Sequence, residues 1–205
     1  MRIQIRTIHP KELNDELLRS FQRTQKVSVC LRKGERGWHL ADIAFTEEWD
    51  AAAKRQVTED LQQISTDGGS VWGAFDGDRL LGFAAVAPQR LGRNQDMIAL
   101  QQLHVSADMR RRGVGHWLFE QAVALGRMTG ARKLYISAHS SLESQAFYDA
   151  LGCTEAWEYD PSHVELEPCD CQLEYRLLPQ SAYEEPLLPS PLAAARQASL
   201  PVPLQ

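Results

Sequence analysis

The most constraining feature of this 205-residue sequence is a strand-like stretch that passes through a basic, glycine-bearing turn into a helix. The stretch Met97–Val105 comes first and begins with four apolar residues, and the helix is entered through residues 110–115, Arg-Arg-Arg-Gly-Val-Gly. The first turn of a helix has backbone N–H groups without internal partners, and the helix dipole adds partial positive charge there. Because Gly113 and Gly115 lack a Cβ, an anion can approach the backbone closely. The turn is predicted to hold phosphate; the alternative is an ordinary helix start with a solvated basic turn.

The turn differs from two better-known phosphate-binding patterns. The sequence contains no Gly-x-x-x-x-Gly-Lys-Ser/Thr, and Leu118 stands where a dinucleotide-binding fingerprint has its third glycine. Arg-x-x-Gly-x-Gly after a strand ending Leu103-x-Val105 instead resembles motif A of the GNAT superfamily, the acyl-CoA-dependent N-acyltransferases. The resemblance implies that the amides of this loop cradle the pyrophosphate of coenzyme A.

A second motif follows at the expected distance, after an intervening strand. Residues 141–153 resemble motif B of the same superfamily, Asn-x-x-Ser/Ala-x-x-Phe-Tyr-x-x-Leu-Gly-Phe, with Ser141 in place of Asn and Cys153 in place of the last Phe. For the aromatic pair Phe147-Tyr148 alone, the alternative is plain core packing. Because both motifs and the strand order around them match, the chain is identified as a member of the superfamily, over residues 2–178 in element order.

The resemblance implies an N-acetyltransferase with acetyl-CoA as co-substrate, whose primary-amine acceptor attacks the thioester directly in a ternary complex. Backbone donors near Leu103 to Val105 are expected to stabilise the oxyanion. The alternative function is a non-catalytic acyl-CoA-binding regulatory module. The residues that the resemblance places around coenzyme A are Leu103, His104, Val105, Arg110, Arg111, Arg112, Gly113, Val114, Gly115, His116, Ser141, Ser144 and Tyr148.

The proton-transfer groups are only partly specified by the motifs. Tyr148 matches the motif B tyrosine, and a phenol with a pKa near 10 is protonated at neutral pH, so it can supply a proton to the departing thiolate. Many relatives carry a Glu base four residues before the valine matched by Val105, but here that position is Gln101, which cannot take a proton. His104 and His139, at the ends of two parallel strands, are the candidate bases. The alternatives are histidines that only satisfy hydrogen bonds, or a water chain to solvent.

Composition excludes several classes of function. The net charge of −5 argues against bulk nucleic-acid binding, because the only dense basic cluster is residues 110–112. No apolar run approaches the roughly 20 residues needed to cross a bilayer, and the N-terminus lacks an apolar signal core. We expect a cytoplasmic enzyme without nucleic-acid or membrane partners; a homodimer is one expected state, since dimers are common in the resembling family. The four cysteines form no Cys-x-x-Cys pair, and no metal site is expected.

The expected fold class is α/β (α+β), the GNAT fold, with a central mixed, mostly antiparallel sheet, a parallel pair splayed at the coenzyme A site and helices on both faces. Asp76-Gly77-Asp78 between two apolar runs predicts a hairpin. Residues 88–95 are expected to form a loop, and a Ser140–Glu143 capping box to start the motif B helix. Hydrophobic periodicity predicts strands near residues 2–7, 27–31, 38–45, 71–75, 80–87, 97–105, 133–138, 153–159 and 171–178, and helices over 10–24, 46–64, 114–130 and 140–152.

Residues 1–178 are expected to form the acetyltransferase domain. Residues 179–205 contain six of the ten prolines and no glycine, which indicates a disordered tail or an extended arm.

The resemblance places the acceptor between the first helical region and the loop joining the last two strands. That loop has no lysine or arginine, and the charges of both regions predict a small cationic amine as the acceptor. The alternative is a solvated acidic loop that touches no substrate. The residues concerned are Glu158, Asp160, Glu165, Glu167 and Asp170 in the loop, and Glu47, Glu48, Asp50, Trp38 and Trp49 in the facing region.

Overall fold

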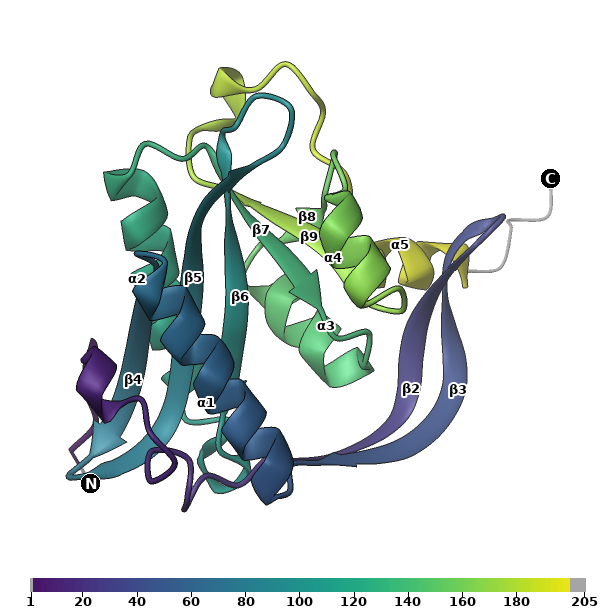
Figure 1. Ribbon diagram of the computed structural model, residues 1–205. Helices are drawn as coiled ribbons and strands as arrows, with labels where there is room; N and C mark the ends of the chain where they lie inside the picture. Colours follow the sequence, from purple (N-terminus) through teal and green to yellow (C-terminus); the bar gives the residue numbers. More distant parts are fainter. Residues whose placement is uncertain (1, 200–205) are drawn as a thin grey trace, which may run out of the picture. The chain divides into compact units, whose positions relative to one another are not determined.

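The computed structural model describes residues 2–199, and the chain divides into two compact units (Figure 1). The first unit holds the chain up to residue 25 together with residues 46–134, and the second holds residues 26–45 together with the chain from residue 135 onward. The strand order of the main sheet is β1-β4-β5-β6-β7-β9-β8, and β2 pairs with β3 in a separate ribbon. The expected mixed, mostly antiparallel sheet with one parallel pair, β6–β7, is confirmed.

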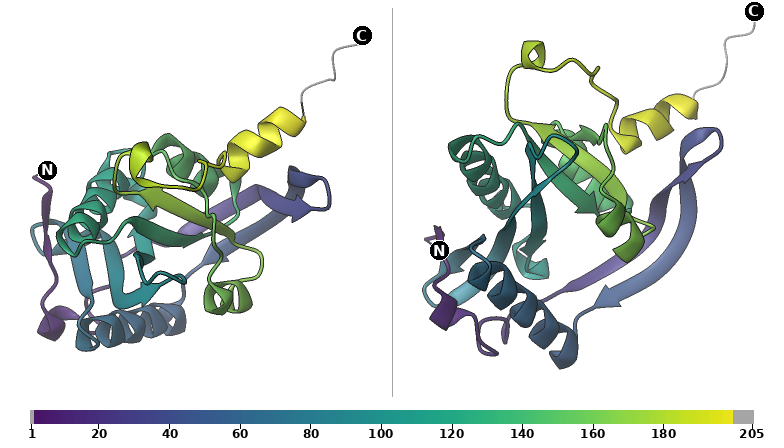
Figure 2. Two further views of the ribbon diagram at one scale, coloured as in Figure 1. Left: turned by 90° about the horizontal axis from the view of Figure 1, so that it is seen from above. Right: turned by 45° about the horizontal axis from the view of Figure 1, so that its top comes forward.

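The first unit contains four strands of the main sheet together with its own helices. Their bounds are β1 Gln4–Thr7, η1 Pro10–Glu12, α1 Ala51–Thr66, β4 Ser70–Asp76, β5 Arg79–Leu91, β6 Met97–Val105, η2 Ala107–Met109 and α2 Val114–Met128. The elements that lie wholly or mostly in the second unit are β2 Thr24–Gly34, β3 Gly37–Glu48, β7 Lys133–Ala138, α3 Leu142–Ala150, β8 Thr154–Glu155, α4 Pro161–Leu166, β9 Cys171–Arg176, η3 Gln180–Ala182 and α5 Pro191–Ala198. Figure 2 shows β2 and β3 as a long two-stranded ribbon. No helix among residues 2–199 is long and apolar enough to cross a membrane.

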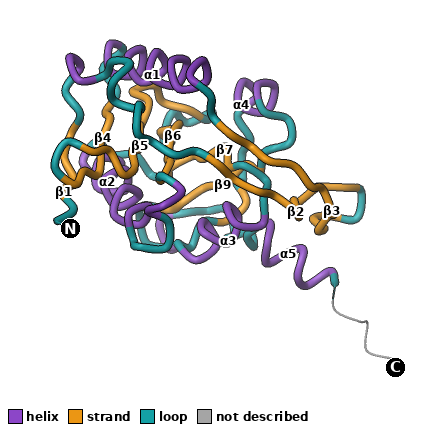
Figure 3. Tube along the Cα trace, turned by 90° about the horizontal axis from the view of Figure 1, so that it is seen from below, coloured by secondary structure: helices purple, strands orange, loops and turns teal. Residues whose placement is uncertain are grey.

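In the first unit, α1 and α2 cover opposite faces of β4, β5 and β6 (Figure 3). Successive residues of β5 serve the two faces, as the period of two along a strand requires. A Cβ at Gly82 would lie 2.9 Å from Val114 and 3.0 Å from Leu118 of α2, so the helix can approach only because glycine is there. On the other face, Phe83 is fully buried in a core cluster that includes Leu61 of α1.

The predicted hairpin is confirmed, whereas two predicted helix starts are wrong. Gly77 takes a φ of +58° between β4 and β5. Residues 10–24 form no α-helix: only the 3-10 turn η1 is regular, capped by His9. The second helix does not begin at Thr46, because β3 continues to Glu48. Its N-cap is Asp50, whose Oδ1 accepts from the Ala53 N–H at 2.8 Å.

Further along the chain, the bounds of two strands and one helix differ from the predicted ones. Strand β5 extends to Leu91 through the expected loop, since Arg90 and Leu91 pair with Ile98 and Met97. The expected strand 153–159 is reduced to β8, and the short helix α4 follows it. The motif B helix is capped one residue later than predicted, at Ser141, whose Oγ accepts from the Ser144 N–H.

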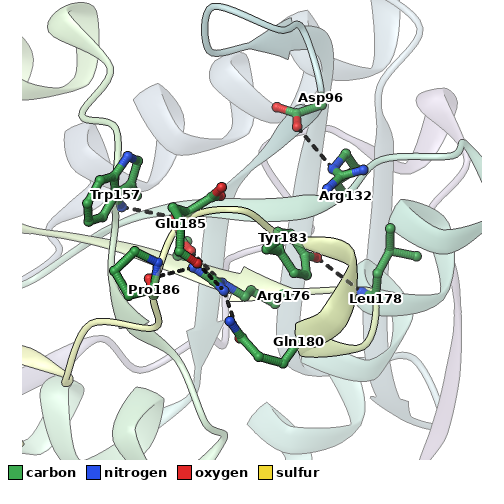
Figure 4. Close-up of polar contacts among 10 residues, drawn as sticks. Asp96, Arg132, Trp157, Arg176, Leu178, Gln180, Tyr183, Glu185 and Pro186 are labelled. Carbon is green, nitrogen blue, oxygen red and sulfur yellow. Dashed lines mark hydrogen bonds and ion pairs between the residues drawn. The ribbon is translucent and has the colours of Figure 1, made fainter.

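Residues 179–199 are folded onto the second unit, in contrast to the disorder that their composition indicates. Helix α5 packs on α3 and buries Leu192 and Ala195 completely. Its N-cap Ser190 bonds to Asp149 of α3. Upstream, the Arg176 guanidinium donates to the backbone of Glu185 and Pro186 (Figure 4). Residues 200–205 of the predicted tail lie outside the described residues.

Candidate functional site

The turn before α2 is shaped by its backbone. Arg111 has a φ of +63° and Gly113 a φ of +82°, and a positive φ at a non-glycine residue is uncommon. Gly113 is the N-cap of α2, yet it offers no side chain to bond the N–H groups of the first helical turn. Within residues 2–199, the side chains of Arg110, Arg111 and Arg112 form no hydrogen bond or ion pair. Backbone amides without a side-chain cap and guanidinium groups without a hydrogen bond thus lie together at the start of one helix. Such groups are the donors that bind a pyrophosphate.

His104, near the end of β6, lies in an aromatic setting in the first unit. Its ring centroid is 4.7 Å from Trp49 and 5.3 Å from Phe83. Removal from water, together with the nearby positive charges of Arg23 and Arg110, lowers the pKa of His104 to about 3. Its Nε2 lies 2.8 Å from Gln102 Oε1. The imidazole is therefore neutral at physiological pH and is a weak proton acceptor.

His139 follows β7 in the second unit and is bonded differently. Its Nδ1 accepts a hydrogen bond from the Ser141 N–H at 3.2 Å, and its ring packs edge-on against Phe45 at 5.9 Å. An Nδ1 that accepts carries no proton, so the neutral ring has its proton on Nε2. In this tautomer, Nε2 is a donor and cannot take a proton from a substrate.

The motif B residues form a compact group at the start and in the middle of α3. The Ser141 and Ser144 hydroxyls lie 3.0 Å apart, and Ser141 is buried beside an isolated bridge to Cys30 of β2. Tyr148 is 8% exposed, and its ring packs at 5.0 Å against Phe147. Burial raises the pKa of Tyr148, and nearby Cys153 and Asp170 add to the effect. The phenol is thus protonated at any physiological pH and can act only as a donor of that proton.

A polar group on one face of β7 was missed from the sequence. The Tyr135 hydroxyl donates to Gln172 Oε1 on β9 at 2.5 Å and accepts from the Asp160 N–H at 2.9 Å. The Gln172 amide in turn donates to Ser137 Oγ, two residues along β7 on the same face. Helix α4 covers this face and α3 the other (Figure 3). In the sequence, Asp160 followed by Pro161 indicates the start of a helix. The contact between that helix and β7 joins residues far apart in the chain, so the sequence does not indicate it.

The acidic residues expected to face an acceptor have different partners. In the first unit, Glu47 pairs with Arg23 at 2.7 Å and Asp50 caps α1. In the second unit, Trp38 is buried and donates its Nε1 to Glu155 at 2.8 Å, so it is no exposed aromatic platform. Glu165 and Glu167, in contrast, are exposed on α4 and just after it.

The same Glu155 lines an open cavity of about 370 Å³ in the second unit. Its carboxylate accepts from Lys33, Tyr159 and Trp38, which pins the β2–β3 ribbon to β8. These hydrogen bonds outweigh the effect of burial and lower the pKa of Glu155. The cavity is lined by Lys33, Glu155, Ala156, Trp157, Tyr159 and Leu188.

The predicted site residues thus fall into two groups, each brought together within its own unit. Leu103, His104 and Val105 end β6, and residues 110–116 form the turn and the start of α2 in the first unit. His139, Ser141, Ser144 and Tyr148 lie in the second unit. Within residues 2–199, no three His, Cys, Asp or Glu side chains are grouped to hold a metal ion.

Comparison with known proteins agrees with this fold. The family model described as "Acetyltransferase (GNAT) family" matches residues 35–153. No curated protein sequence matches the chain. Similar solved structures include nourseothricin acetyltransferase, with a TM-score of 0.58 and 16% identity over 85% of this chain and 96% of that one.

Two other similar structures were solved with a bound coenzyme. A putative streptothricin acetyltransferase from Bacillus anthracis, in complex with acetyl coenzyme A, has a TM-score of 0.62 and 14% identity, and 85% of this chain and 96% of that chain are covered. The PaiA N-acetyltransferase from Thermoplasma acidophilum, in complex with coenzyme A, has a TM-score of 0.54 and 15% identity, and 86% and 99% are covered. At these identities the likeness is one of fold.

Proposed function

This chain belongs to the acetyltransferase (GNAT) family, enzymes that use acetyl-CoA as co-substrate, and we propose that it acetylates the primary amine of a small cationic molecule. The observation that carries the proposal is the turn at residues 110–115. Its left-handed backbone at Arg111 and Gly113 leaves the first N–H groups of α2 without a side-chain cap. Three arginines beside that helix start supply further donors for a pyrophosphate.

The residues proposed to hold acetyl-CoA fit an anionic ligand. Loop amides and guanidinium groups of residues 110–116 would bind the pyrophosphate, and backbone donors near Leu103 to Val105 would stabilise the oxyanion of the transition state. Ser141 and Ser144 would contribute hydroxyl groups from the start of α3. Acetyl-CoA supplies the activated acyl group and a thiolate leaving group.

We assign Tyr148 as the general acid. The reaction releases a thiolate that must gain a proton, and the buried phenol keeps its proton because burial raises its pKa. Protonation of a leaving group by a positioned side chain is typically worth about 10²- to 10⁴-fold in rate.

The two histidines first considered as bases are less well suited to that task. The pKa of about 3 leaves His104 with little affinity for a proton, and His139 in its neutral form presents an N–H at Nε2. We propose that they orient groups by hydrogen bonding, and that the base lies elsewhere.

The acceptor assignment rests on charge. The loop from Glu158 to Asp170 has five carboxylates and no lysine or arginine, and Glu165 and Glu167 are exposed on it. Carboxylates raise the local concentration of a cation. Two similar structures are named for acetylation of nourseothricin and streptothricin, so these compounds belong in the acceptor panel.

The test is a thiol-release assay with acetyl-CoA and a panel of amines at fixed ionic strength. The panel holds spermidine, a lysine amide, nourseothricin, glutamate and aspartate. We expect amine-dependent thiol release with the cationic compounds. Acetyl-CoA binding without release for any amine would support the non-catalytic module instead, and a preference for glutamate or aspartate would overturn the acceptor class.

A further inference from the structure

We propose that the Asp160–His163 pair at the start of α4 takes the proton from the acceptor amine, directly or through one water. The inference rests on the proposed acetyl transfer, and it supplies the base that Gln101 cannot provide. The pair lies in the loop between β8 and β9, where acceptors are expected from the resemblance described above.

The geometry fixes the tautomer of His163. Asp160 Oδ1 accepts from the His163 backbone N–H at 3.1 Å and lies 2.7 Å from Nδ1 of the ring. Burial raises the pKa of Asp160, but the hydrogen bonds from His163 outweigh this effect and hold the pKa below its usual value. An ionised carboxylate can only accept, so Nδ1 carries the proton and Nε2 carries the lone pair.

The Nε2 lone pair has no partner in the part of the chain that the structure describes. No hydrogen bond joins this atom to any group among residues 2–199. The ring is held edge-on against Tyr135 with the centroids 5.2 Å apart, and its side chain is 19% exposed. A ring held by Asp160 and Tyr135, with one nitrogen not bonded to the described chain, has the form of an oriented base.

None of the other five histidines has this arrangement. His104 and His139 are unsuited for the reasons given above. His9 uses Nδ1 to cap η1, and His116 lies 4.0 Å from Glu120 on an exposed surface. His39 is exposed on β3 and has no hydrogen bond in the described chain.

The groups facing His163 are one carboxylate and several uncharged side chains. Asp160 supplies a negative charge from α4 itself. From β7, Tyr135 is neutral because burial raises its pKa, and Gln172 of β9 is uncharged. Next in the chain, Tyr159 is also kept neutral by burial and by its hydrogen bond to Glu155.

The step balances without another reactant. The acceptor enters as an ammonium ion, and one proton passes from its nitrogen to Nε2, which forms an imidazolium beside the Asp160 carboxylate. The nitrogen lone pair then forms the bond to the acyl carbon as the carbon–sulfur bond breaks, and the departing thiolate takes the Tyr148 proton. The nitrogen loses its second proton as the amide forms, and that proton restores the Tyr148 phenol. The proton on His163 leaves to solvent after product release.

The decisive variant is His163→Asn, whose amide nitrogen can replace the Nδ1 donor to Asp160 but cannot take a proton. For the most active cationic amine, we expect kcat/KM to fall about 10²- to 10⁴-fold near neutral pH. The deficit should shrink as pH rises, because the free amine then forms in solution. The affinity for acetyl-CoA, measured by calorimetry, should not change. His39→Asn is the matched control and should behave as the wild type.

Several outcomes overturn the assignment. A purely structural role predicts that His163→Asn keeps wild-type activity, since the hydrogen bond to Asp160 is retained. A deficit that is equal at every pH would also contradict proton transfer. Nitrogen-15 spectra of His163 give a readout independent of turnover: the account requires the Nδ1–H tautomer, and an Nε2–H tautomer would refute it. A wild-type enzyme inactive with every amine would instead refute the proposed function.

Discussion

The turn before α2 and the loop that carries α4 are built in opposite ways. In the turn, the groups proposed to bind the ligand are backbone amides, in a segment where Arg111 and Gly113 take left-handed conformations and no side chain caps α2. In the loop, the polar groups are side chains, with Asp160 and His163 held against Tyr135. The turn is cationic and the loop is acidic. Because of this difference, an added Cβ should abolish binding at the turn before α2. At the loop that carries α4, removal of one polar atom should abolish the proposed function.

The largest expected effect is that of Gly113→Val on coenzyme A binding. A β-branched residue resists a φ of +82°, so the turn should rearrange and the amides of α2 should lose their orientation. We expect no measurable CoA binding by calorimetry, with the fold retained by circular dichroism. Gly130→Val is the matched control, because Gly130 has a φ of +71° after the other end of α2 and open space around its Cα. If both variants lose CoA equally, the effect is one of stability.

Removal of a single hydroxyl tests the side-chain part of the comparison. Tyr148→Phe keeps the ring packed on Phe147 and removes only the proton donor. We expect kcat to fall about 10²- to 10⁴-fold with little change in KM for acetyl-CoA. Tyr183→Phe, a buried tyrosine of the same unit bonded to the Leu178 N–H, is the control. If the chemical step limits the rate and Tyr148→Phe keeps most of the wild-type kcat, Tyr148 is not the general acid.

Most strands and the turn before α2 could be predicted because their signals are local. Met97–Val105 begins with four consecutive apolar residues, and the arginine-glycine turn follows within ten residues. The error at Thr46 is non-local in origin, since pairing within the β2–β3 ribbon carries β3 to Glu48 and leaves Asp50 to cap α1. The proline-rich end hid a helix start, Ser190-Pro191 before three alanines, which sequence rules could have found.

The chemistry of the candidate bases could not be predicted from their positions in the sequence. The pKa of His104 is lowered first by burial beside aromatic rings, and then by the charges of Arg23, more than 80 residues earlier, and Arg110. The short spacing from Asp160 to His163 indicates a helix cap. The proposed role in proton transfer could be inferred only from the structure, in which β7 places Tyr135 against the ring of His163. The motifs therefore predict where the turn before α2 lies, whereas the chemistry of the candidate proton-transfer groups depends on contacts that the sequence does not show.

A substitution in α5, the helix that packs on α3, is expected to lower stability and to leave the binding of CoA unchanged. Leu192→Ala removes a side chain that is 1% exposed, and such a change costs about 2–5 kcal/mol of unfolding free energy. We expect a lower midpoint in urea but unchanged CoA affinity, because α5 belongs to the second unit and the turn proposed to hold the pyrophosphate belongs to the first. Leu187→Ala, at a 55% exposed leucine, should leave the midpoint unchanged. A loss of CoA affinity in the Leu192 variant below its unfolding transition would contradict this separation.

The smallest effect concerns the charge of the loop. Replacing Glu165 and Glu167 by glutamine removes two exposed carboxylates without altering the Asp160–His163 pair. We expect KM for spermidine to rise about two- to five-fold at low salt, and the difference to fade as salt screens the charges. The affinity for acetyl-CoA should stay constant. An unchanged KM at low salt would mean that the acidic loop does not face the acceptor.

The most direct test of the central claim is a competition between spermidine and glutamate, mixed at equal concentration with acetyl-CoA and the wild-type enzyme. Mass spectrometry of the products gives the ratio of the two kcat/KM values, which measures specificity independently of absolute rates. The account predicts acetylated spermidine in large excess, with formation that depends on enzyme and matches thiol release. Acetylated glutamate as the main product, or thiol release without any acetylated amine, would contradict it.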